Sequence, residues 1–179
     1  MKGKLLCMAV LLTALWAAAA WAEPAPFGLE LRKTTLKEVK RRFDLKFVGK
    51  DAKYGWSFYD VKKWDVEKLG FDGLRGIKLD FDRDGKLIAV LCLFVKPKAK
   101  ELFGMLKEKY RLVYKEGNPD EPIGFGALFD GGNKVRIVLK KSAKPYSTLL
   151  YICQEYSRML RKSVAEDRAA QRKREKDLL

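Results

Sequence analysis

Hydrophobic residues recur at helical spacing in two separate segments of the chain. In the first, Thr35 and Glu38 form a capping box, the signature of a helix start, and apolar residues follow three and four positions apart. The second segment shows the same spacing after Pro97. The apolar positions are Leu36, Val39 and Phe43 in the first segment, and Leu102, Phe103, Leu106 and Tyr110 in the second. The pattern predicts two amphipathic helices.

Alternating and continuous apolar runs between these segments predict strands. Residues 77–81 alternate apolar and polar, residues 83–86 form a turn, and residues 87–95 are apolar throughout, which predicts a β-hairpin with a buried second strand. A second hairpin is expected around a Gly-rich turn at 130–133, which has neither a phosphate-loop pattern nor a G-x-G-x-x-G pattern. The remaining strand predictions are 56–64, 111–116 and 148–153.

Two sets of positions repeat along the chain and suggest an internal duplication. At one constant offset, Leu36, Val39, Phe43 and Leu45 match Phe103, Leu106, Tyr110 and Leu112; at a smaller offset, 81–82, 86–87 and 90–91 match 129–130, 134–135 and 138–139. The predicted fold class is α+β: an antiparallel sheet from two helix-then-hairpin repeats, 34–96 and 97–153, with the helices packed on one face, plus a C-terminal helix. Convergent patterning of amphipathic elements is the alternative.

Two motifs carry a resemblance to a known class of proteins. Thr35-Leu36-Lys37-Glu38-Val39 opens the first helix, and Phe81-Asp82-Arg83-Asp84-Gly85-Lys86-Leu87 spans the first hairpin turn. With the order of elements, they resemble small secreted tandem helix-and-sheet repeat proteins, typified by β-lactamase-inhibitor-protein-like domains and small outer-membrane assembly lipoproteins. The chain lacks that class's Gly before the Thr, its Gly-Pro after the helix and its lipid-attachment cysteine. The resemblance implies a binding, inhibiting or scaffolding role outside the cytoplasm, and no residue roles.

The first 22 residues have the pattern of a secretory signal peptide. Lys2 and Lys4 precede an uncharged apolar run that ends in Ala20-Trp21-Ala22. Cleavage after Ala22 would leave a single α+β domain at 23–164 and a polar, charged helix or tail at 165–179, in the periplasm or outside the cell. An uncleaved membrane anchor is the alternative, because the run approaches the length that spans a bilayer.

Charge and the absence of histidine limit the chemistry. The 179 residues contain 38 Lys and Arg, 23 Asp and Glu and no His, for a net charge of +15, or +13 without Lys2 and Lys4. Catalytic systems built on imidazole are therefore excluded. No carboxylate pair has a spacing that indicates a catalytic cleft. We expect no enzymatic activity and no cofactor, and an enzyme using carboxylates alone is the remaining catalytic alternative.

The carboxylates and cysteines of the chain bear on metal binding and disulfide formation. Asp80, Asp82, Asp84 and Gly85 match the start of a calcium loop, but Leu91 stands where the bidentate Glu is needed, so we expect no metal. Two cysteines, Cys92 and Cys153, follow the signal segment. An oxidising compartment allows a disulfide between them, and two buried free thiols are the alternative.

One cluster of aromatic and basic residues is a candidate binding site. Its members are Trp56, Tyr59, Lys62, Lys63 and Trp64. Aromatic faces stack on rings and lysines neutralise charge, so this composition suits a ring-bearing or anionic ligand. The alternative is that these aromatics cover the sheet beneath a loop.

The functional expectation is a non-enzymatic envelope protein that binds an acidic protein, anionic lipid or acidic wall polymer, which includes peripheral membrane contact. Nucleic acid is not expected as a partner, because export separates the protein from it. The alternative is an inhibitor of a secreted hydrolase, with an exposed loop such as 117–124 entering the active site. The sequence gives neither the identity of the ligand nor the oligomeric state.

Overall fold

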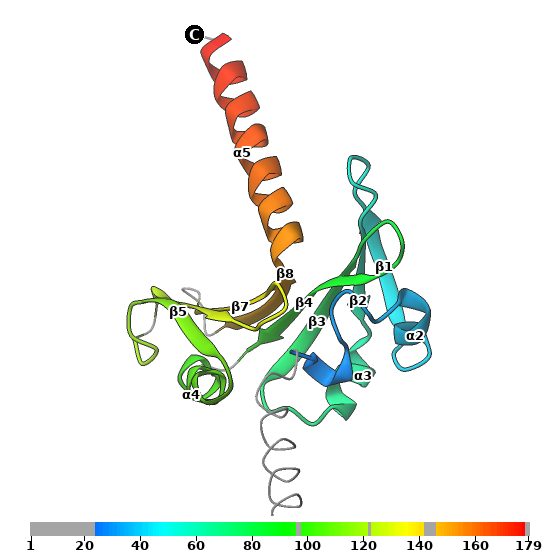
Figure 1. Cartoon of the computed structure of the whole chain (residues 1–179), viewed down its shortest axis with the longest axis vertical. Coiled ribbons are helices and arrows are strands. Elements are labelled where there is room, and N and C mark those ends of the chain that lie inside the picture. Colours follow the sequence, from blue (N-terminus) through cyan, green and yellow to red (C-terminus); the bar gives the residue numbers. More distant parts are fainter. Residues whose placement is uncertain (1–23, 96–97, 122, 142–145, 178–179) are drawn as a thin grey trace, which may run out of the picture.

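One antiparallel sheet of eight strands organises the molecule (Figure 1). The computed structural model describes residues 24–95, 98–121, 123–141 and 146–177. The strands lie in the order β1-β2-β3-β4-β8-β7-β6-β5, so β4 and β8 pair at the centre while β1 and β5 form the edges. The predicted combination of an antiparallel sheet with helices is confirmed.

The strands are β1 (Leu45–Lys50), β2 (Ser57–Val61), β3 (Leu74–Phe81), β4 (Leu87–Phe94), β5 (Arg111–Glu116), β6 (Phe125–Asp130), β7 (Val135–Lys141) and β8 (Ser147–Cys153). The helical elements are the 3-10 turn η2 (Pro26–Gly28) and the α-helices α2 (Leu36–Lys40), α3 (Lys63–Lys68), α4 (Ala99–Lys109) and α5 (Gln154–Asp177). The signal peptide prediction lies outside the described residues.

The capping box at the start of α2 is present as predicted. The Glu38 backbone N–H donates to Thr35 Oγ1 at 3.3 Å, and the Thr35 N–H donates to Glu38 Oε2 at 2.7 Å. These bonds satisfy backbone donors that a helix start leaves unpaired. The helix ends at Lys40, earlier than the spacing suggested, because the chain turns there and continues into β1. Phe43 still lies in the core.

The hairpin of β3 and β4 is confirmed, whereas the segment around it differs from the prediction. The strand expected at 56–64 ends at Val61, and residues 63–68 form α3, so Trp64 lies on a helix. The edge strand β1 was not predicted. Its side chains Lys46, Phe47 and Val48 are all exposed, so the strand has no alternation of buried and exposed positions that a sequence pattern could reveal.

Two hydrophobic clusters form the core. The larger one joins sheet residues to Val39 of α2, Val66 of α3 and Leu106 of α4. The smaller one surrounds Trp56 and includes Tyr156 of α5. Beyond its first turns α5 rises away from the sheet, on the side opposite α4 (Figure 1). The 24 residues of this helix span about 36 Å.

The two cysteines are free and buried, and the disulfide considered from the sequence is not formed. Cys92 of β4 pairs in register with Leu149 of β8, so Cys153 lies four residues further along the strand. Four residues of a strand span about 13 Å, which exceeds the Cα separation of about 7 Å that a disulfide can bridge. Burial raises the pKa of Cys92 to about 12 and that of Cys153 to about 11, so both thiols are protonated and unreactive at neutral pH.

Candidate binding surface

The structure separates the five residues of the aromatic and basic cluster. Trp56 is buried, with its ring stacked on Tyr54 at 4.3 Å and edge-on to Tyr156 at 4.5 Å. Tyr59 packs on Phe81 at 5.7 Å in the larger cluster, on the other face of the sheet. Trp56 and Tyr59 are an odd number of residues apart, and successive side chains of a strand point to opposite faces.

The other three residues lie at the start of α3. The Lys62 ammonium stands 4.7 Å from the centre of the exposed Trp64 ring, while Lys63 forms a 3.7 Å ion pair with Glu67. Of the five residues, Lys62 and Trp64 form a cation–aromatic pair with each other. The structure therefore does not bring these five residues together, because the chain changes from strand to helix among them.

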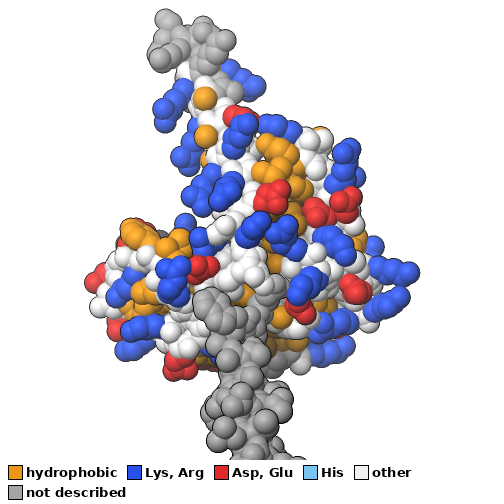
Figure 2. Space-filling view, viewed as in Figure 1, with side chains coloured by type: hydrophobic (Ala, Val, Ile, Leu, Met, Phe, Trp, Pro, Cys, Tyr) orange, Lys and Arg blue, Asp and Glu red, His pale blue; other side chains and the backbone are white. Residues whose placement is uncertain are grey.

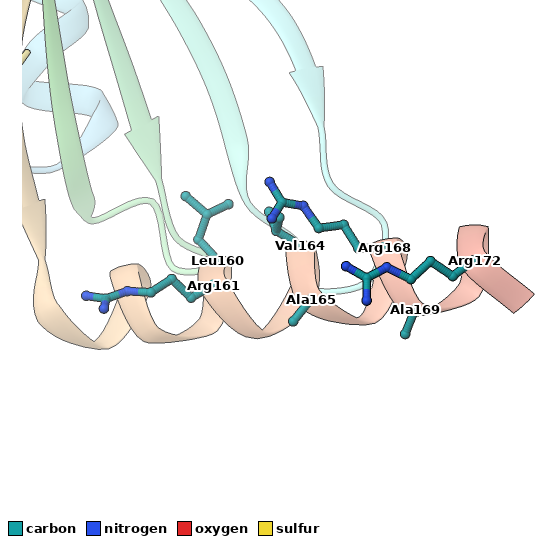
Figure 3. A pocket seen from close by; sticks show the side chains of 7 residues that line it. All are labelled: Leu160, Arg161, Val164, Ala165, Arg168, Ala169 and Arg172. Carbon is teal, nitrogen blue, oxygen red and sulfur yellow. The ribbon is translucent and has the colours of Figure 1, made fainter. Parts of the chain in front are cut away.

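A different surface gathers basic and apolar side chains, and it lies on α5. Leu160 and Val164, four residues apart, are 41% and 40% exposed and project from the same side of the helix (Figure 3). Arg161, Arg168 and Arg172 flank them, and the Arg168 guanidinium lies beside Val164 (Figure 3). With Ala165 and Ala169 these side chains line a shallow groove of about 560 Å³. We call these seven residues the arm surface.

The arginines of the arm surface have no carboxylate partner among the described side chains. Arg161 donates only to the Ser157 hydroxyl of its own helix, at 3.3 Å. Lys and Arg also cover much of the domain below α5 (Figure 2). By sequence the chain from Glu155 onward carries +3 and residues 23–154 carry +10. Three guanidinium groups beside exposed apolar side chains can contact an anionic surface and an apolar one at the same time.

The base of α5 is fixed to the domain at two levels. Near the sheet, Tyr156 packs on Trp56 and its hydroxyl donates to Asp80 Oδ2 at 2.9 Å. Further along the helix, the Lys53 ammonium contacts Glu166 Oε2 at 2.7 Å, which ties α5 to the loop between β1 and β2. Because that ion pair is exposed, the buried aromatic contacts provide most of the attachment.

A cavity of about 370 Å³ lies beside this attachment. Its aromatic lining comes from Tyr54, Trp56 and Tyr156, and its charged lining consists of Arg32, Arg83, Lys86, Asp82, Asp84 and Glu155. The charges of opposite sign are equal in number, so this cavity does not select anions. Asp82 is used by the turn between β3 and β4, where its Oδ1 accepts from the backbone N–H of Asp84 and of Lys86.

Asp80 is a partly buried carboxyl at this attachment. Burial raises its pKa above the ordinary value, although the hydrogen bond from Tyr156 and the charge of Lys78 act in the opposite direction. Between the unfolded pKa of about 3.9 and the higher folded pKa, Asp80 therefore carries more protons in the folded state than in the unfolded state. The free energy of unfolding that this group contributes is largest below this pH range and declines as the pH rises through it.

We expect Asp80→Asn to remove this decline. The amide keeps an oxygen that accepts from Tyr156 and carries no charge to desolvate, so the variant should be at least as stable as the wild type at neutral pH. Urea unfolding at a series of pH values from 4 upward measures the difference. Asp84→Asn, at an exposed carboxyl of the adjacent turn, is the control. Equal pH dependence in Asp80→Asn and the wild type would contradict the assignment.

No sequence pattern points directly to the arm surface. Leu160 and Val164 lie at helical spacing from Tyr156 and Met159, and such a stripe by itself predicts packing on the domain. In the structure only the first part of that stripe is covered, because α5 leaves the sheet after its first turns. Within the described residues, no helix combines the length and apolar composition needed to cross a bilayer. In the same part of the chain, no three Cys, Asp or Glu side chains are grouped to hold a metal ion.

The geometry thus offers a basic and apolar helix surface raised above an antiparallel sheet. Comparison of the chain with protein-family models, with curated proteins and with solved structures finds no match in any of the three.

Proposed function

We propose that this protein is a non-enzymatic protein of the cell envelope, and that the arm surface binds an acidic protein or an anionic envelope component. The observation that carries the proposal is the placement of Arg161, Arg168 and Arg172 beside exposed Leu160 and Val164, on a helix that stands away from its domain. A solvated helix has no need for an apolar stripe along its basic side, whereas a partner surface uses both.

The location belongs to the same proposal. Its support is the sequence of residues 1–22, with two lysines before an apolar run that ends in small residues. A cationic protein exported beyond the inner membrane meets anionic lipid head groups, acidic wall polymers and acidic proteins. The long-range attraction between such charges is screened at high salt, with a Debye length of about 8 Å at physiological ionic strength.

The non-enzymatic role is supported by the residues available for catalysis. The chain contains no histidine. Among the described carboxyl groups, Asp80 has its pKa raised, and its hydrogen bond to Tyr156 gives it a role in holding α5. A carboxyl used in this way is part of the attachment of the helix.

We also propose the two-repeat organisation of the domain, with α2 and α4 as equivalent helices. The strand order supports it, since β1 to β4 run from one edge to the centre and β5 to β8 run from the other edge to the centre. In this arrangement Leu45 at the start of β1 is equivalent to Leu112 near the start of β5, and the larger sequence offset pairs the same two residues. The smaller offset instead matches the β3–β4 turn with the β6–β7 turn. In the proposed repeat the β3–β4 turn would correspond to the connection between β7 and β8, so the smaller offset does not follow this arrangement.

The test is binding to vesicles of phosphatidylglycerol mixed with phosphatidylcholine, measured by co-sedimentation over a range of salt. We expect binding at low salt that falls steeply as salt rises. Replacing Arg161, Arg168 and Arg172 by Gln should weaken binding by at least tenfold. The control with equal charge removed is Lys37→Gln, Lys107→Gln and Lys140→Gln, at exposed positions outside α5.

The control variant separates a specific surface from general basicity. If both triple variants lose binding equally, net charge alone acts and the arm surface is not the site. Absence of binding at low salt, both to vesicles and to an acidic protein from envelope fractions, would refute the proposal. Far-UV circular dichroism checks that α5 stays helical in each variant.

The second candidate function is inhibition of a secreted hydrolase by the loop at 117–124. Its supporting observation is Ile123, which is 53% exposed on a loop whose base is fixed by Lys141 donating to the Pro119 carbonyl at 3.1 Å. An inhibitor should recover one enzyme in stoichiometric amount from a periplasmic or extracellular fraction. Ile123→Asp should then abolish that recovery and leave vesicle binding unchanged.

A further inference from the structure

A third concave surface lies on the face of the sheet opposite to the one on which the base of α5 packs. It is a groove of about 400 Å³ between α4 on one side and the segment 25–27 with Phe71 on the other. Its floor is formed by Cys92 and Phe94 of β4 and by Leu149 and Tyr151 of β8, the two central strands. The volume is within the range of small-molecule sites, about 300–1,000 Å³. We call it the central groove.

The walls of the central groove are apolar and partly uncovered. Phe27 and Phe71 pack edge to face at 5.6 Å and form one wall. Leu102, Met105 and Leu106 of α4 form the other. Phe71 is 53% exposed and Met105 is 49% exposed, so large apolar side chains on both walls remain in contact with solvent. An apolar ligand between these walls would remove that surface from water.

The positive charge of Lys98, at the start of α4, is already paired. The Lys98 ammonium lies 2.6 Å from Glu101 Oε2 and 3.1 Å from Asp72 Oδ2. This pair of contacts joins α4 to the segment that precedes β3 and closes the groove at this end. No unpaired charge of Lys98 is left for a ligand.

The end of the groove at the C-terminus of α4 is different, because polar donors lie there that have no hydrogen-bond or ion-pair partner among the described residues. The hydroxyl groups of Tyr110 and Tyr151 form no hydrogen bond with any described residue, and Lys109 forms no ion pair with a described carboxylate. Burial raises the pKa of both tyrosines, so their hydroxyls remain proton donors at neutral pH. Lys98 and Lys109 are eleven residues apart in sequence, or about 16 Å along the helix.

An apolar channel with two free hydroxyl donors and one ammonium at a single end matches an amphiphile with an anionic head. We propose that the central groove binds a single-chain carboxylate amphiphile, with its hydrocarbon chain between Phe71 and Met105 and its carboxylate at Tyr110, Tyr151 and Lys109. The hydroxyls and the ammonium donate to the carboxylate, which is an acceptor only. The chain points toward the end that Lys98 closes.

Isothermal titration of the purified protein with dodecanoate at pH 7.5, below its micelle concentration, tests this site. We expect saturable binding of one molecule per chain. Met105→Glu, at an exposed wall position that tolerates a charge, should abolish it. Lys109→Ala and Tyr151→Phe should each weaken it by about tenfold, the loss of one charge-assisted hydrogen bond. Dodecanol should bind at least tenfold more weakly than dodecanoate.

Lys107→Ala is the matched control, since Lys107 is an exposed lysine of the same helix that does not line the groove. It should bind dodecanoate as the wild type does. The Gln variant of Arg161, Arg168 and Arg172 should also bind normally, which keeps this test independent of the proposed function. No saturable binding, or equal binding by wild type and Met105→Glu, would overturn the proposal. Equal affinity for dodecanol, or normal binding by both Lys109→Ala and Tyr151→Phe, would overturn the head-group assignment.

Discussion

Trp56→Ala should lower the free energy of unfolding by about 3–5 kcal/mol, the usual cost of removing a large aromatic side chain from a core. Trp56 is 6% exposed and is the residue on which Tyr54 stacks and against which Tyr156 packs edge-on. Its loss leaves a cavity between the sheet and the base of α5. Urea unfolding followed by far-UV circular dichroism measures the change. The helical signal of the folded state should also fall, because α5 loses its packing contact with Trp56.

Trp64→Ala is the control for that experiment, because it removes the same side chain from an exposed position. Trp64 is 47% exposed and its ring contacts the Lys62 ammonium at 4.7 Å. A cation–π contact at an exposed site is worth about 0.5–1 kcal/mol, so the expected loss of stability is of that size. Similar losses in the two variants would contradict the assignment of Trp56 to the attachment of α5.

Phe129→Ala should cost a similar amount, about 3–5 kcal/mol, on the other half of the sheet. Phe129 of β6 is fully buried and its ring lies 5.8 Å from that of Phe103 on α4. The central pairing of β4 with β8 joins the first four strands to the last four, so we expect them to unfold in a single transition. Fluorescence of Trp56 and Trp64, which both lie in the first half of the sheet, should therefore show the same lowered urea midpoint in Phe129→Ala, relative to the wild type.

Phe47→Ala is the matched control, since Phe47 lies on the edge strand β1 and is 56% exposed. It should change stability by no more than about 1 kcal/mol, because its truncation leaves no buried cavity. Two separate transitions in Phe129→Ala, with fluorescence unaffected in the first, would show that the two halves of the sheet unfold independently.

The candidate binding surfaces could not be predicted from local sequence patterns, because they depend on how distant segments pack. Trp56 and Tyr59 are neighbours in sequence and lie on opposite faces of the sheet. The donors of the central groove come from α4 and β8, about 40 residues apart in the chain, and no local pattern relates Lys109 to Tyr151. The arm surface depends on where α5 leaves the sheet. A helical stripe alone does not determine which of its residues are covered.

Local patterns determined the secondary structure of most of this protein. The capping box at Thr35 and Glu38 predicted the start of a helix, the alternation before Gly85 predicted a hairpin strand, and residues 111–116 were predicted as a strand; all three are present. Each of these elements depends on contacts within a few residues. The tertiary structure alone decided the pairing of β4 with β8, the separation of Cys92 from Cys153 and the exposure of Leu160. Each of these follows from contacts between segments distant in the chain, whose energies depend on the packing of the whole sheet.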